Sequence, residues 1–149
     1  MAVRAAVIDY GKSATKGDGS IQRIQWNGLT GGVDTGAPIP FAEWADGCVQ
    51  MGTLNILTGG SSTLTGDTAV MQGSNDYQPS ATDDASPANA GTWTTLKDEN
   101  GAAISATALG AIFNFNERPL WVRPAMTAGT GTWNFVLVVR RAQSMMRGG

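Results

Sequence analysis

Histidine is absent from this chain of 149 residues, and cysteine occurs once, as Cys48. The absence of histidine removes the commonest general base, the commonest metal ligand and the side chain that titrates near neutral pH. A single cysteine forms no internal disulfide, and no histidine is present to activate Cys48 as a nucleophile. We therefore expect Cys48 to be a small buried side chain, and we expect the protein not to be an enzyme.

Charged residues are also scarce, and long hydrophobic runs are missing. Charged residues make up 15% of the chain, against about 25% in typical soluble domains. The first segment, MAVRAAVIDYG, contains Arg4 and Asp9, which interrupt the apolar stretch that a signal peptide needs. No apolar run has the length of a transmembrane helix. We expect a protein that is made in the cytoplasm, that either stays there or is released by cell lysis, and that has no membrane partner.

The few charges are unevenly distributed along the chain. Residues 26–139 hold three basic and ten acidic side chains, a net charge of −7, whereas residues 1–25 and 140–149 carry +2 and +3. Basic ends suit an acidic protein surface. Nucleic acid is the weaker alternative, because the C-terminal tail is short and has no aromatic residue, and we expect no nucleic-acid partner. We expect partner contacts from basic and apolar residues of the two ends, namely Arg4, Arg140, Arg141, Met145, Met146 and Arg147.

Glycine is abundant, with 20 residues, and short apolar runs alternate with turn residues. This pattern predicts an all-β chain, an antiparallel β-sandwich of about eight strands that is jelly-roll-like and has extended N- and C-terminal segments. We divide the chain into an N-terminal arm or edge strand (1–20), a sandwich domain (21–140) and a basic C-terminal tail (141–149). Period-two alternation places Trp26 on a buried face and Gln25 on an exposed one. Residues 41–46 suggest one helical turn before Gly47.

The sequence pattern of residues 67–103 predicts two antiparallel strands joined by a long polar insert. The insert region contains the oxygen-bearing residues Asn75, Asp76, Asp83 and Asp84. Calcium binding is one reading, but the spacing is not that of an EF-hand loop, and these residues are common in turns. We therefore expect a solvent-exposed loop, with no metal and no cofactor.

Five tryptophans are the largest apolar side chains, and we expect them in the core and in a subunit interface. A tryptophan ring can instead stack on a sugar, which is the alternative for any that is exposed. The five are Trp26, Trp44, Trp93, Trp121 and Trp133.

Four segments resemble small structural proteins of tailed bacteriophages. They are VMQGSND (70–76), TWTTLKDENG (92–101), PLWVRP (119–124) and the apolar strand WNFVLVV (133–139). The stretch IQWNGLTGGVDTGAPIPFAEWADGCVQM is also similar to these proteins, so the resemblance covers about residues 20–140. The insert at residues 79–91 and the basic tail depart from the family pattern.

The resemblance implies a capsid decoration, or cement, protein that binds the outer surface of a phage capsid lattice. It implies the major capsid protein as partner, a homo-oligomer (dimer or trimer), and a location on the capsid exterior of the virion. Such proteins stabilise contacts between capsid subunits without catalysis. Two alternatives are a receptor- or glycan-binding β-sandwich of a tail or fibre, and a tail-tube or head-completion protein.

Overall fold

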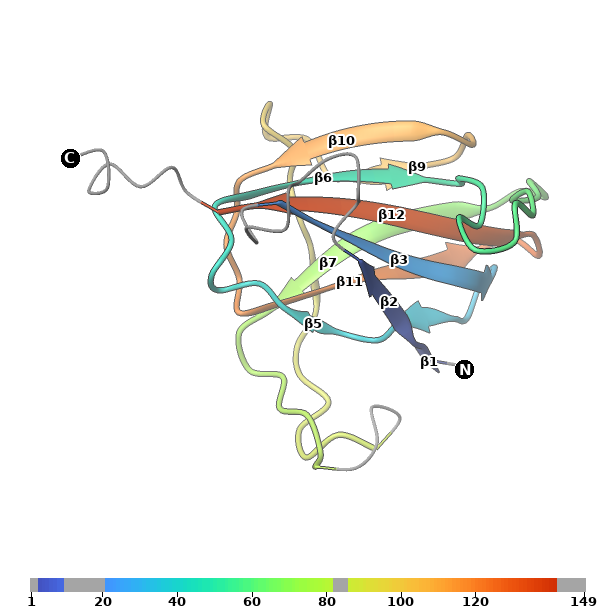
Figure 1. Cartoon of the computed structure of the whole chain (residues 1–149). Coiled ribbons are helices and arrows are strands. Elements are labelled where there is room, and N and C mark those ends of the chain that lie inside the picture. The colour runs from blue at the N-terminus through green and yellow to red at the C-terminus, as the bar shows by residue number, and fades with distance from the viewer. Residues whose placement is uncertain (1–2, 10–20, 82–85, 142–149) are drawn as a thin grey trace.

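The structure, a computed structural model, describes residues 3–9, 21–81 and 86–141. Every regular element within these residues is a β-strand. They form two sheets that pack against each other (Figure 1). The five-stranded sheet has the order β10-β6-β12-β3-β2 and contains β2 (Ala6–Asp9), β3 (Ile21–Thr30), β6 (Asp46–Met51), β10 (Ala111–Phe115) and β12 (Thr132–Arg140). The seven-stranded sheet has the order β1-β4-β11-β7-β8 and contains β1 (Val3–Arg4), β4 (Thr35–Gly36), β5 (Ile39–Pro40), β7 (Thr68–Ser74), β8 (Thr94–Thr95), β9 (Ser105–Ala106) and β11 (Trp121–Ala128).

The strand order is that of a jelly roll. Because β4 and β5 both pair with β11, and β8 and β9 both pair with β7, the chain from β3 onward occupies eight strand positions. Numbered along the chain, these positions read 6-3-8-1 in one sheet and 2-7-4-5 in the other, which is the jelly-roll arrangement. The predicted all-β sandwich is confirmed. The described residues hold twelve strands rather than about eight, because two positions are split and β1 and β2 are added at sheet edges.

Alternation along β12 explains how the two sheets pack. β12 lies between β6 and β3, and its outward-facing Val136 and Val138 are half-buried. Every second side chain of a strand points to the same face, so the other set meets the opposite sheet. This inward set is 0% exposed and consists of Trp133, Phe135, Leu137 and Val139.

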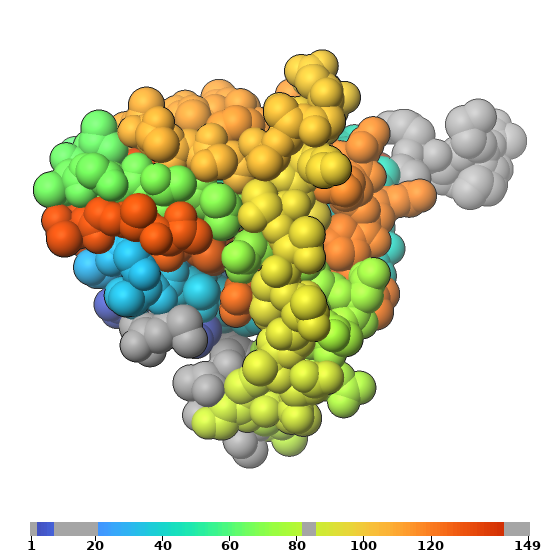
Figure 2. Space-filling view, turned by 180° about the vertical axis from the view of Figure 1, so that it is seen from behind, coloured from blue at the N-terminus to red at the C-terminus, as the bar shows by residue number. Residues whose placement is uncertain are grey.

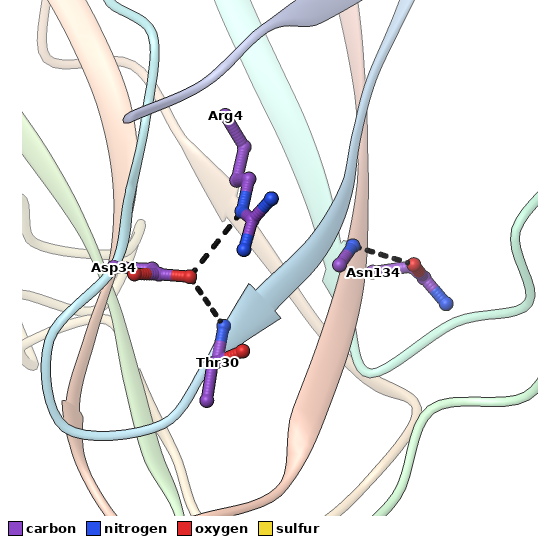
Figure 3. Close-up of polar contacts among 5 residues, drawn as sticks. Arg4, Thr30, Asp34 and Asn134 are labelled. Atoms are coloured by element: carbon purple, nitrogen blue, oxygen red, sulfur yellow. Dashed lines mark hydrogen bonds and ion pairs between the residues drawn. The ribbon is translucent and has the colours of Figure 1, made fainter. Parts of the chain in front are cut away.

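A β-bulge interrupts the pairing of β3 with β12. Trp133 lies opposite Leu29 and Phe135 lies opposite Trp26, so two residues of β3 face Asn134 alone. One of the two, Gly28, has a φ of 73°, which glycine adopts without steric strain. Its N–H donates to Asn134 Oδ1 at 3.0 Å (Figure 3). The asparagine side chain thus takes up a backbone donor that the bulge leaves without a ladder partner.

The predicted exposure of Gln25 is wrong, although its face is as expected. Gln25 lies on the outer face of the five-stranded sheet, yet it is 0% exposed. Its Nε2 donates to Asn27 Oδ1 and, at 3.3 Å, to Asn55 Oδ1 in the loop after β6. Alternation identifies the face of a sheet but not the loop that folds over it, and this is why the prediction failed.

Two further local predictions are wrong. Residues 41–46 form a hydrogen-bonded turn rather than a helical turn, with Trp44 N–H donating to Phe41 O at 3.1 Å, and β6 already begins at Asp46. The neighbouring strand holds the chain in this path, since Ala45 N–H donates to Arg140 O at 2.8 Å. Cys48 is half-buried rather than buried, because it lies on the outer face of β6. Partial burial raises the pKa of its thiol.

Candidate functional site

The arginines predicted to bind a partner lie at opposite ends of the sandwich. Arg4 of β1 contacts Asp34, which follows the Thr30 end of β3, whereas Arg140 ends β12 opposite Ile21. Thr30 and Ile21 pair with the first and last residues of β12, which are separated by roughly 27 Å at about 3.4 Å per residue. The structure therefore does not bring Arg4 and Arg140 into one site.

Each of the three described arginines of this set has an acidic neighbour. Arg4 Nε lies 3.3 Å from Asp34 Oδ2, and the same oxygen accepts the N–H of Thr30 at 2.9 Å (Figure 3). Asp34 is 3% exposed, so this contact fixes β1 to the end of β3. Met145, Met146 and Arg147 lie outside the described residues, and their role stays a prediction.

The other two arginines make surface ion pairs at the opposite end. Arg140 Nη1 lies 3.9 Å from Asp46 Oδ1, and Arg141 Nη1 lies 3.1 Å from Glu43 Oε2. The Arg141 guanidinium also lies 4.6 Å from the ring centroid of Trp44. Exposed pairs of this kind contribute about 0–1 kcal/mol each, so both side chains can exchange these contacts for a partner's at little cost.

The polar insert leaves the sandwich through a hydrogen-bonded base. Asp76 Oδ1 accepts the N–H of Thr92 at 2.6 Å, and Asp76 Oδ2 accepts its hydroxyl at 2.9 Å. Farther along the insert, Gln78 and Asn89 exchange two backbone hydrogen bonds of 2.9 and 3.1 Å. We call these contacts the insert clamp. Beyond it the chain projects away from both sheets (Figure 1), and after returning it runs across the rear face of the molecule (Figure 2).

The two described candidate ligands near the insert, Asn75 and Asp76, serve as hydrogen-bond acceptors for other groups of the chain. Asp76 accepts from Thr92 and Ser74, and Asn75 Oδ1 accepts the N–H of Leu120 at 2.9 Å. These bonds, the Thr92 N–H first, hold the pKa of Asp76 below its ordinary value. Asp83 and Asp84 lie outside the described residues, and within those residues no three His, Cys, Asp or Glu side chains group as a metal site.

The tryptophans divide into two groups. Trp26, Trp44 and Trp133 are at most 3% exposed, which confirms the core prediction for these three. Trp93 and Trp121 are half-buried. Trp121 begins β11, and it alternates with Val122, which points into the core. Trp121 therefore lies on the outer face of the seven-stranded sheet.

Four side chains form a cluster on this outer face, which we call the Arg123 patch: Tyr77, Trp93, Trp121 and Arg123. The Tyr77 ring centroid lies 5.1 Å from that of Trp121, edge to face, and 5.5 Å from that of Trp93. The Arg123 guanidinium lies 4.1 Å from the Trp93 ring centroid, and its Nε donates to Gln72 Oε1 at 2.9 Å. Partial burial lowers the pKa of Arg123 to about 10.

Sequence reasoning missed Arg123, because it weighed arginines only at the two ends of the chain. A signal was present: Trp121 and Arg123 stand two residues apart in a strand, which places both on one face. The contact with Trp93 was not available from this pattern, since Trp93 reaches the cluster from the far side of the insert.

The Arg123 patch lies at the same end of the sandwich as Arg140. Phe41 N–H donates to Leu120 O at 2.7 Å, next to the start of β11, and Ala45 N–H donates to Arg140 O at 2.8 Å. The short segment 41–45 therefore joins the two sites. A surface groove of ≈ 530 Å³ lies beside the insert clamp, and it is lined by Asp76, Thr92, Glu117 and Arg118 among others. This end of the molecule thus combines the insert, the aromatic cluster and the last described arginines.

Within the part of the chain that the structure describes, no helix has the length and apolar character needed to span a membrane. No protein-family model and no curated protein matches the sequence. A search of solved structures finds similarity to the crystal structure of SPBc2 prophage-derived protein YomS. The TM-score is 0.52 and the identity 12%, with 80% of this chain and 93% of the other covered. At this identity the likeness shows a shared fold.

Proposed function

We propose that this chain is a non-enzymatic structural protein of a phage virion, which binds the outer surface of the capsid and stabilises contacts between major capsid subunits. The observation that carries the proposal is the likeness of fold, over 80% of this chain, to a protein derived from a prophage. The sequence resemblance to structural proteins of tailed phages points in the same direction.

The proposed mechanism is adhesive. A sandwich held by a continuous core from both sheets is rigid enough to bridge two neighbouring subunits, with Arg4 near one end and Arg140 and Arg141 at the other. Each contact is small, but the sites repeat over a closed shell. Linked or repeated contacts bind far more tightly than any single one, because each later contact forms at a high effective concentration.

A second candidate function is glycan or receptor binding by a tail or fibre module. Half-buried Trp93 and Trp121 beside a projecting insert favour it, since aromatic rings stack on sugars. Protection of tryptophan fluorescence by a sugar, lost in Trp93→Ala but not in Trp26→Phe, is the result that would favour this candidate over the first.

The proposal is tested by adding the purified protein to phage capsid shells that lack it and to isolated phage tails. Binding is measured as the amount of protein that sediments with each particle. We expect saturable binding to shells and none to tails. Binding to tails alone would contradict the capsid assignment.

The C-terminal tail is tested in the same assay. Removal of residues 142–149 is expected to lower shell occupancy by about tenfold at limiting protein, since an avid contact is lost, while the temperature of thermal unfolding stays within about 2 °C. The matched control is Arg118→Gln, which changes one exposed basic residue elsewhere. Unchanged occupancy after the truncation would remove the tail from the mechanism.

A further inference from the structure

Arg123 is a partly buried cation without an acidic partner among the described residues. Its Nε donates to Gln72, and within those residues no carboxylate lies in ion-pair contact with it. Arg4, Arg140 and Arg141 each have such a contact. A guanidinium carries five N–H donors in a planar fork, so the terminal nitrogens of Arg123 remain available for an anion. Burial without a counter-charge is the costly state for an arginine.

The ring contacts hold this guanidinium in a fixed position. Trp93 lies against its face, Tyr77 links Trp93 to Trp121, and the insert clamp joins the two residues that precede Tyr77 and Trp93, Asp76 and Thr92. The Trp93 indole N–H also donates to Ala90 O at 2.8 Å. A preorganised side chain loses little entropy when a ligand binds. Tryptophan, tyrosine and arginine are also the residues that most often dominate the energy of protein interfaces.

The charge around the patch selects the kind of anion. Residues 26–139 carry a net charge of −7, which repels a polyanion such as nucleic acid over a wide area. A single carboxylate avoids this repulsion, because it meets one guanidinium inside a frame of apolar rings. Carboxylate and guanidinium pair through two parallel hydrogen bonds, and the unused nitrogens of Arg123 provide that geometry.

We propose that the Arg123 patch is the anchor of a protein interface and receives an aspartate or glutamate side chain of the partner. The contact then lies on the outer face of the seven-stranded sheet, close to the insert and to Arg140. The identity of the partner as a capsid subunit rests on the proposed function; the carboxylate specificity of the patch does not.

The first experiment uses shells that lack the protein, with the full-length chain and three variants. Arg123→Gln is expected to weaken binding by at least about tenfold, and Arg123→Lys to weaken it less, because lysine keeps the charge but not the fork. Arg118→Gln, which removes the same charge from an exposed position in the neighbouring groove, is expected to bind within about twofold of the wild type. Equal effects of Arg123→Gln and Arg118→Gln would overturn the proposal.

The second experiment does not depend on the capsid. The ¹⁵N-labelled protein is titrated with a capped pentapeptide that holds one glutamate between alanines, its counterpart with glutamine in place of glutamate, and inorganic phosphate, while the Arg123 Nε–H and Trp93 indole signals are followed. We expect both signals to shift with the glutamate peptide alone, and Arg123→Gln to abolish the Trp93 shift. Shifts with phosphate of equal size, or none with the glutamate peptide, would overturn the proposal. Shifts with the glutamate peptide but no binding to capsid shells would leave the patch assigned and refute the capsid function.

Discussion

At the scale of single residues, two aspartates of this chain close loops: buried Asp67 and exposed Asp76. Asp67 is 2% exposed and accepts the N–H groups of Gly131 at 2.7 Å and Thr65 at 2.6 Å, as well as the Trp133 indole N–H at 3.2 Å. It thereby joins the segment before β7 to the loop before β12. Asp76 does the same at the base of the insert, in solvent. Of the polar residues that the sequence marks as possible ligands, Asn75 and Asp76 therefore have structural partners within the chain.

Replacement of the buried acid should be costly. Asp67→Ala leaves three donors without their acceptor, and we expect a loss of about 3 kcal/mol in the free energy of unfolding, measured by urea denaturation. Glu99→Ala, which removes the same charge from an exposed side chain, should change it by less than about 0.5 kcal/mol. Similar losses in both variants would show that charge, and not loop closure, is the contribution of Asp67.

The insert clamp should depend on pH. Because hydrogen bonds lower the pKa of Asp76, ionised Asp76 stabilises the clamp above its ordinary pKa of 3.8, and this contribution is lost as the pH falls through the lowered value. We expect the Thr92 amide signal to titrate with a midpoint below 3.8, and Asp76→Asn to remove that transition. A midpoint at or above 3.8 would contradict the hydrogen bonds that Thr92 donates to Asp76.

At the scale of elements, the sheets and the insert have different tasks. β7 and β11 provide both the inner face that closes the core and the outer face that carries Gln72, Trp121 and Arg123. The insert leaves between β7 and β8, and its described residues outside the clamp are exposed or half-exposed. The strands thus fix the fold, while the insert adds a projecting surface beside the Arg123 patch.

Shortening the insert tests this division. We replace residues 79–88 by Asn-Gly, which forms a tight turn between the paired Gln78 and Asn89. The free energy of unfolding should stay within about 1 kcal/mol of the wild type, since no core side chain is removed. Tyr77–Trp93 packing should persist, as read from the near-ultraviolet circular dichroism of the aromatic rings. Global unfolding of this variant would show that the insert belongs to the folding unit.

At the scale of the whole molecule, strand periodicity was enough to predict the sandwich, and the places where prediction failed share a cause. The alternation of β3 placed Trp26 on the buried face correctly, because the opposite sheet covers that face. Gln25 was misjudged because a distant loop covers it, and Arg123 was missed because its contact with Trp93 spans the insert. The alternation of residues in a strand predicts the face on which a side chain lies. It does not predict which segment, distant in the sequence, packs on that face.

The central claim is that the molecule binds a repeated lattice, and the copy number of the chain per virion tests it most directly. Quantitative mass spectrometry of purified particles, with the major capsid protein as internal reference, provides the number. The account predicts on the order of hundreds of copies, because adhesion over a shell depends on repetition. About a dozen copies or fewer would place the protein at a neck, tail or fibre and contradict the account.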